Sequence, residues 1–300
     1  MRRLPGDDVS YEQRIAAPVL PESNVMAKLD VLIHLRRTDD DAPAARAGLA
    51  LAKRLDAWVL GLHVVPTATA AFATPEAVAV QVHQPDQFYE DALTRAPWWH
   101  AQLDRHSLSG EWQVSQGDTV EALCHAARWC DLIVLERPLL HPDAPTGWGL
   151  VSRTVFGAAT PAVVVPEAAR LDSIGAHVLI AWNRSRESSL AIRAALPLLV
   201  RAERVTVLAG DPVEDPLGLR SRPAFDLDTW LRRRDVTTAT FQPFEPERKH
   251  GAAILDAARA AGADLIVMGA WGHSRISELV LGGATRHLFQ NSELPLLVAH

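Results

Sequence analysis

Short apolar runs alternate with amphipathic stretches from about residue 29 to the end of the chain. Several runs are rich in β-branched and aliphatic residues throughout, which is typical of strands that helices cover on both faces of a parallel sheet. In the first half we predict strands at 31–35, 58–65, 111–117, 131–137 and 161–166, and helices at 44–57, 86–106 and 118–130.

Cap residues precede two of these helices. Asp39 to Asp41, followed by Pro43, predict the N-cap and first turn of the helix at 44–57. Asp118 or Thr119 is expected to cap the helix at 118–130.

The second half repeats this order of elements. We predict strands at 177–183, 204–210, 264–270 and 294–300, and helices at 185–199, 226–234 and 251–263. The helix at 185–199 is expected to end near Pro197, and its charged residues are expected to form a solvent-exposed face. The segment 212–246 is polar and proline-containing around its short helix.

The repeat is visible in individual residues as well as in the pattern. Segment 126–137 matches 257–270, so that Asp131 corresponds to Asp264. Segment 149–156 likewise shares glycine, arginine and phenylalanine with 282–289. The chain is therefore predicted to be a tandem duplication of one α/β unit.

We predict three parts: an N-terminal arm at 1–28, a first unit at 29–168 and a second unit at 174–300. Each unit is expected to be a doubly wound, mostly parallel five-stranded sheet with strand order 3-2-1-4-5. An uncovered apolar edge strand is a liability, so the final strands at 161–166 and 294–300 should pair with each other. The two units would then form a pseudo-dimer within one chain, and a further homodimer could form.

Composition narrows the class of protein. The net charge is −6, with 30 basic and 36 acidic side chains, which argues against nucleic-acid binding. The sequence contains neither an apolar run of about 20 residues nor an apolar segment after its charged start, so we expect a cytoplasmic protein rather than a membrane or secreted one. Its two cysteines, Cys124 and Cys130, lack the spacing of a metal or redox site.

Ligands of open α/β sheets bind outside the carboxyl ends of the strands, where the strand order reverses. In the second unit three stretches are predicted to converge there. Glycines in the third stretch would let the backbone turn sharply and approach a ligand, and the final helix would offer free N–H groups to a phosphate. The candidate residues are Ala181, Trp182 and Asn183, then Gly210, then Met268, Gly269, Gly272, His273, Gly282, Gly283, Ala284 and Thr285.

The spacing of Gly269, Gly272 and Gly282 resembles the glycine signature of the nucleotide-binding universal stress proteins. The stretch 269–286, the residues AWNRSRES after the strand at 177–183, and the tandem arrangement are also similar to that family. The resemblance covers about residues 29–300, but its specific motif lies only in the second unit. It implies an adenine nucleotide alpha hydrolase-like fold.

In that family ATP lies across the strand ends, and its adenine and ribose meet the end of the first strand and the backbone after the second. The resemblance implies that Asn183 stands at the usually acidic position, where it could bond a ribose hydroxyl or a base edge, and that Gly210 stands at the second-strand position. The glycines would hold the phosphates, with Mg²⁺ accompanying ATP. Gly283 departs from the family because it replaces a Ser or Thr; the N–H groups of Gly283 and Ala284 remain, and Thr285 could supply a hydroxyl.

The first unit departs further from the motif. Arg36 corresponds to Asn183, Glu136 to Gly269 and Leu139 to Gly272. A carboxylate at position 136 would repel a phosphate, so we expect this unit to be structural and to bind no ATP in the family manner.

The favoured function is that of a nucleotide-responsive stress-response protein, regulatory or protective, with adenine nucleotide and an unidentified protein as partners. Two alternatives stay open: an interaction module in which both sites have decayed, and a slow ATPase. The sequence contains no catalytic motif that would make a more active enzyme. We expect no catalytic and no metal-binding residues.

Overall fold

The first half of the chain forms five strands with helices between them. The computed structural model describes residues 28–66, 86–138, 149–169, 173–210, 226–244, 250–270 and 283–300. The elements of the first half are β1 (Asp30–His34), α1 (Pro43–Leu55), β2 (Trp58–Pro66), α3 (Ala96–His106), β3 (Ser109–Gly117), α4 (Thr119–Ala127), β4 (Leu132–Arg137), α5 (Leu150–Ala158) and β5 (Ala162–Pro166).

The second half repeats this succession. Its elements are β6 (His177–Trp182), α6 (Arg186–Leu199), β7 (Arg204–Ala209), α7 (Leu227–Arg232), β8 (Ala239–Pro243), α8 (His250–Ala260), β9 (Leu265–Gly269), α9 (Gly283–Asn291) and β10 (Leu296–Ala299).

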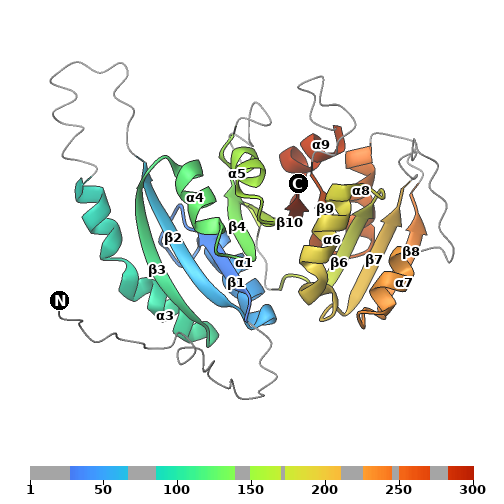
Figure 1. Ribbon diagram of the computed structural model, residues 1–300, viewed down its shortest axis with the longest axis horizontal. Helices are drawn as coiled ribbons and strands as arrows, with labels where there is room; N and C mark the ends of the chain where they lie inside the picture. The colour runs from blue at the N-terminus through green and yellow to red at the C-terminus, as the bar shows by residue number, and fades with distance from the viewer. Residues whose placement is uncertain are drawn as a thin grey trace, which may run out of the picture.

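All ten strands form one sheet, in the order β3-β2-β1-β4-β5-β10-β9-β6-β7-β8 (Figure 1). Each half has the predicted order 3-2-1-4-5 with parallel neighbours. The halves join where β5 and β10 pair antiparallel, with Val163 opposite Leu297. The predicted α/β class, strand order and pairing of the final strands are therefore confirmed.

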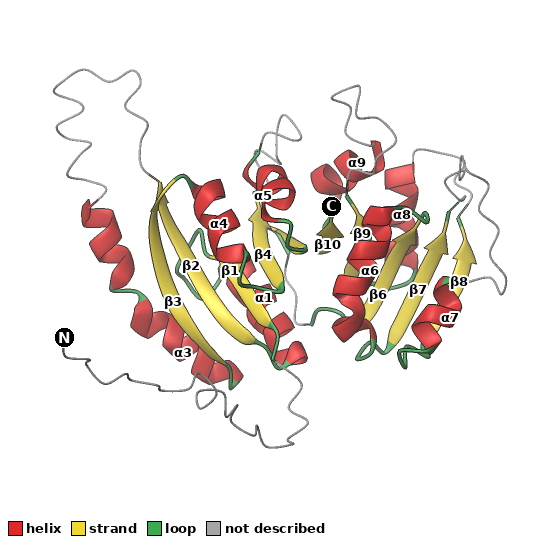
Figure 2. Ribbon diagram, viewed as in Figure 1, coloured by secondary structure: helices red, strands yellow, loops and turns green. Residues whose placement is uncertain are grey.

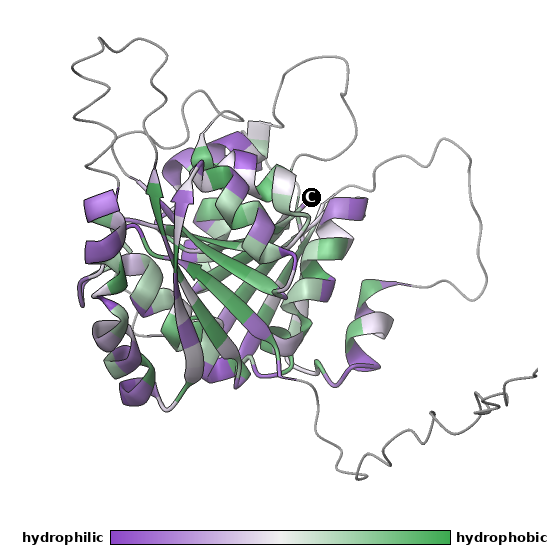
Figure 3. Ribbon diagram, turned by 60° about the vertical axis from the view of Figure 1, so that its left-hand side comes forward, coloured by the Kyte–Doolittle hydropathy of each residue, from purple (hydrophilic) through white to green (hydrophobic). Residues whose placement is uncertain are grey.

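Helices cover both faces of this sheet (Figure 2). One buried cluster draws on α1, α3, α6 and α7, and a second draws on α4, α5, α8 and α9. Each cluster takes residues from both halves, so each core belongs to a face of the sheet and continues across the joint. The strands between the helices are largely apolar (Figure 3).

Strand β8 was absent from the predicted strands. It is the edge strand of the second half, and four of its five residues are exposed, with the burial pattern ieeee. An exposed edge strand has no buried face to impose an apolar pattern, which is why its sequence was interpreted only as part of a polar segment.

Two local predictions needed correction. Helix α1 begins at Pro43 with Ala42 as its N-cap and no side-chain cap, so Asp39 to Asp41 do not cap it. The helix predicted at 86–106 is interrupted by a turn at 94–95, and Pro97 lies in the first turn of α3, where a missing N–H costs nothing. The helix predicted at 185–199 is confirmed, since α6 ends at Leu199, two residues after Pro197. The expected cap of α4 is Asp118, which accepts a hydrogen bond from the Glu121 N–H.

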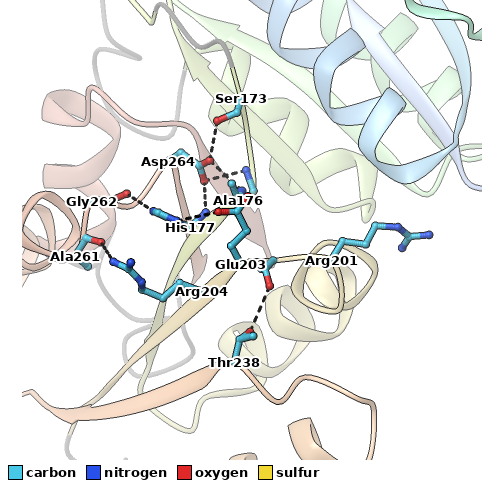
Figure 4. Close-up of polar contacts among 12 residues, drawn as sticks. Ser173, Ala176, His177, Arg201, Glu203, Arg204, Thr238, Ala261, Gly262 and Asp264 are labelled. Atoms are coloured by element: carbon cyan, nitrogen blue, oxygen red, sulfur yellow. Dashed lines mark hydrogen bonds and ion pairs between the residues drawn. The ribbon is translucent and has the colours of Figure 1, made fainter.

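Aspartates at the start of β4 and β9 tie the amino ends of the strands together. Asp264 accepts hydrogen bonds from the backbone N–H groups of Gly175, Ala176 and His177 at 2.9, 2.9 and 3.1 Å (Figure 4). Its counterpart Asp131 accepts a bond from the Asp30 N–H at 2.8 Å. The repeat thus extends to individual hydrogen bonds.

Candidate functional site

The carboxyl ends of β6 and β7 lie side by side in the second half. Trp182 is paired in register with Ala209, and the N–H of Gly210 donates to the Trp182 carbonyl at 2.8 Å. A Cβ at position 210 would lie 3.5 Å from the Trp182 oxygen and 3.8 Å from Phe244. The structure therefore brings together the first two predicted stretches, and the third begins beside them because Met268 is paired with Ala181.

Asn183 follows β6 and is exposed. Its side-chain oxygen accepts a hydrogen bond from the Ser185 N–H at 3.1 Å, and Arg184 between them has a φ of 64°. This turn leads into α6, where Ser185 caps the helix by accepting from the Ser188 N–H. The Asn183 side chain thus stabilises the turn that leads into α6.

Position 269 must be a glycine because the backbone of α6 lies too close for any side chain. A Cβ there would collide with the backbone nitrogen of Ser188 and lie 2.8 Å from the Glu187 Cβ. The end of β9 therefore packs against the first turn of α6, and any side chain at position 269 would push the two apart.

The first turn of α6 was missed as part of the site. Glu187 and Ser188 are both buried there, although the charged residues of this helix were expected to be solvent-exposed. Arg186 and Arg193 are exposed as expected, so the correction concerns Glu187 alone. A carboxylate in the first helical turn is favoured by the helix dipole. The glycine at position 269 was the signal in the sequence, because a glycine at a strand end indicates that another segment packs closely there.

The start of α9 supplies the other predicted phosphate contacts. Gly283 is exposed, and a Cβ there would meet nothing within 4 Å among the described residues. Ala284 is half-buried, whereas the side chain of Thr285 is buried against the sheet. Thr285 is therefore the least accessible of the three.

The remaining predicted residues divide into two groups. Ala181 and Met268 are paired in register, with Met268 buried in the core. Gly272, His273 and Gly282 lie outside the described residues, as does the N-terminal arm up to residue 27. Contact of any of these residues with a ligand stays a prediction.

The corresponding place in the first half is occupied by Glu136. Its side chain is 2% exposed and lies 3.7 Å from Arg36 and 4.0 Å from Arg37. The N–H of Ala44, in the first turn of α1, also donates to this carboxylate. Burial raises the pKa of Glu136, and the two arginines act in the opposite direction. A carboxylate of the chain itself thus occupies the place that Gly269 keeps small in the second half.

His34 lies beside this place at the end of β1 and is 2% exposed. Its Nδ1 has no hydrogen-bond partner within the described part of the chain. Burial, with Arg36 and His63 nearby, lowers the pKa of His34 to about 4, so the ring is neutral at pH 7. The first half therefore presents a neutral ring and a paired carboxylate at its strand ends.

Neither half assembles a metal site from the described residues, which hold no group of three histidine, cysteine, aspartate or glutamate side chains suited to a metal ion. None of the described helices combines the length and apolarity needed to cross a membrane.

The C-terminal fifth of the chain matches a known protein family. Residues 241–300 match the model of the universal stress protein family. No curated protein sequence matches the chain.

Two solved structures resemble about nine-tenths of the chain, and a third resembles less than half of it. A universal stress protein from Archaeoglobus fulgidus DSM 4304 superposes with a TM-score of 0.67 at 14% identity, covering 90% of this chain and 96% of that one. A functionally unknown protein from Pseudomonas aeruginosa PAO1 superposes with a TM-score of 0.55 at 14% identity, covering 91% and 92%. A universal stress protein family protein from Arabidopsis thaliana, solved with AMP bound, covers 46% of this chain and 92% of its own at 15% identity, with a TM-score of 0.32.

Proposed function

We propose that this chain, which carries a universal stress protein sequence in its C-terminal segment and the fold of those proteins over most of its length, is an adenine-nucleotide-binding protein. The nucleotide would bind at the strand ends of the second half. Its binding would order the adjoining loop and so change a surface that a protein partner recognises, giving a regulatory or protective rather than a catalytic role.

The observation that carries this proposal is the convergence of two helix starts on one sheet edge. Gly269 lets the first turn of α6 approach the end of β9. Helix α9 lies between the parallel strands β9 and β10 in the chain, so its start faces the same edge. The N–H groups at the start of α9 would favour phosphate without requiring basic side chains, which suits a chain with a net charge of −6.

In this proposal the adenine and ribose lie near Gly210 and Asn183, and the phosphates lie against the N–H groups of Gly283 and Ala284. Gly272 and Gly282 complete the phosphate loop, as the sequence motif implies. Since the described residues offer no metal-ligand group of their own, Mg²⁺ would arrive with ATP and neutralise its phosphates.

We assign the first half a supporting role. The Glu136 carboxylate, held by Arg36 and the Ala44 N–H, stands where a phosphate would need neutral space. Two negative groups at one helix start would repel each other. The proposed nucleotide stoichiometry is therefore one per chain.

A second candidate function is an interaction module without a nucleotide. Gly283 favours it, because the hydroxyl that the family places there is missing. Restoring this hydroxyl distinguishes the two functions, since the space around position 283 is open and accommodates a serine.

The test is calorimetric titration of the full chain with ATP, with and without Mg²⁺, and with AMP. We expect one site per chain, and Gly283→Ser should tighten ATP binding by about two- to tenfold, the range of one added hydrogen bond of roughly 0.5–1.5 kcal/mol. Gly283→Ala is the matched control, because it changes the backbone freedom in the same way but adds no hydroxyl.

The other outcomes of the titration distinguish the alternative functions. Binding by Gly283→Ser but not by the parent protein would favour the decayed-site module. No heat with either protein at millimolar nucleotide would overturn the proposal. Phosphate release above the level without protein would point to the slow ATPase.

A further inference from the structure

Arg137 links the two halves of the molecule through a buried guanidinium. It ends β4 in the first half and is 4% exposed. Its Nη1 donates to the carbonyl of Phe289 and its Nη2 to the carbonyl of Ser292, both in the second half.

The two carbonyls belong to the carboxyl end of α9. The last carbonyls of a helix lack partners within it and carry the negative end of its dipole, so a cation stabilises them. Helix α9 has no basic residue in its own last turn. Arg137 therefore supplies, from the other half, the positive charge that this helix end lacks.

Helix α9 is short and packs against α8, where a Cβ at Gly251 would collide with His287. It has nine residues, of which Thr285, Leu288 and Phe289 are buried. A helix this short is marginal by itself, so its placement depends on tertiary contacts. By contrast α6 has 14 residues and buries seven of them.

The link is one-sided. In the repeat the residue corresponding to Arg137 is Ala270, which cannot make such bonds. At the opposite joint the ring of His300 instead packs edge-on against Phe156 of α5, with ring centroids 4.7 Å apart. Arg137 therefore acts on α9, the helix whose start lies at the candidate nucleotide site.

We propose that Arg137 is a positioning residue for the nucleotide site of the second half: by holding the carboxyl end of α9, it sets where the start of that helix presents its N–H groups. The inference rests on the proposed function. It assigns the first half a part in binding although that half binds no nucleotide itself.

The experiment compares ATP affinity and amide hydrogen exchange in the parent protein, Arg137→Met and Arg137→Lys. We expect Arg137→Met to weaken ATP binding about tenfold, as the loss of charge-assisted hydrogen bonds predicts, and to speed exchange in α9 without nucleotide. Arg137→Lys keeps the charge but not the two-pronged geometry, so it should recover part of the affinity.

Arg54→Met is the matched control. Arg54 of α1 also donates across the joint, to the Arg201 carbonyl after α6, and so loses a comparable bond. Because α6 is held by its own buried face, this variant should keep ATP affinity within about twofold.

The outcomes separate the two proposals. ATP binding by the parent with unchanged affinity in Arg137→Met would overturn the positioning role and leave the proposed function standing. No binding by the parent would overturn both. Equal losses in Arg137→Met and Arg54→Met, with exchange faster throughout, would show a general loss of stability and overturn the specific role of Arg137.

Discussion

At the scale of residues, polar side chains at the strand ends of the first half are buried, and two of them bond to other parts of the protein. Glu136 is buried and paired with Arg36, and Arg137 reaches the other half. His34 is buried, and its Nδ1 has no hydrogen-bond partner among the described residues. A buried polar atom without a hydrogen bond costs free energy, and the cost rises steeply when the group becomes charged. His34 therefore makes the stability of the protein depend on pH.

His34 predicts a loss of stability in mild acid. Its folded pKa of about 4 lies below the ordinary value of 6.5, so the unfolded chain binds the proton more tightly. The contribution of the neutral ring is fully present above pH 6.5 and is lost as the pH falls towards 4, by up to about 1.4 kcal/mol per pH unit. His34→Leu should remove this part of the slope, as measured by urea unfolding from pH 7 to pH 5. An unchanged slope in that variant would contradict the assignment.

At the scale of elements, corresponding aspartates of the two repeats accept different numbers of backbone hydrogen bonds. Asp264 fixes the segment that enters β6 through three backbone N–H groups, whereas Asp131 receives one at β1. Asp131 also lies near Asp30, whose pKa is raised by burial and by the charge of Asp131. The same substitution should therefore have unequal effects in the two halves.

Asp264→Asn should lower the free energy of unfolding by about 2 kcal/mol, since an amide cannot accept all of these charge-assisted bonds. Asp131→Asn, the matched variant in the first half, should cost less than about 1 kcal/mol because it also relieves repulsion from Asp30. Chemical denaturation of both variants at pH 7 measures the difference. Equal costs would mean that the backbone bonds of Asp264 add nothing beyond the single bond of Asp131.

At the scale of the whole molecule, the two halves share both of their cores. The antiparallel pairing of β5 with β10 continues the sheet, and each buried cluster crosses that joint. The hydrogen bonds of Arg54 and Arg137 cross it as well. Neither half can lose its core without exposing apolar surface of the other.

The described part of the chain should therefore unfold in one cooperative step despite its duplicated sequence. In differential scanning calorimetry we expect a single transition whose calorimetric and van't Hoff enthalpies agree. Two resolved transitions would show that the joint is weaker than the halves it connects.

The sequence by itself determined the elements and their order wherever the pattern reports burial. Runs such as 31–35 and 161–166 are apolar because both faces of their strands are covered, so periodicity located them and the repeat gave their order in each half. The glycine spacing likewise marked the candidate site. The domain bounds and the nucleotide contacts stay predictions.

Tertiary structure alone decided the rest. An exposed edge leaves no apolar pattern, which hid β8, and the burial of Glu187 depends on a glycine 82 positions further along the chain, Gly269. In the sequence, Arg137 looks like an ordinary charged residue at the end of a strand. It is nevertheless buried, because its guanidinium donates to carbonyls of residues 152 and 155 positions further along the chain. Hydrophobic periodicity in the sequence shows which face of a strand or helix is covered. Hydrogen bonds between polar groups far apart in the chain produce no such periodicity.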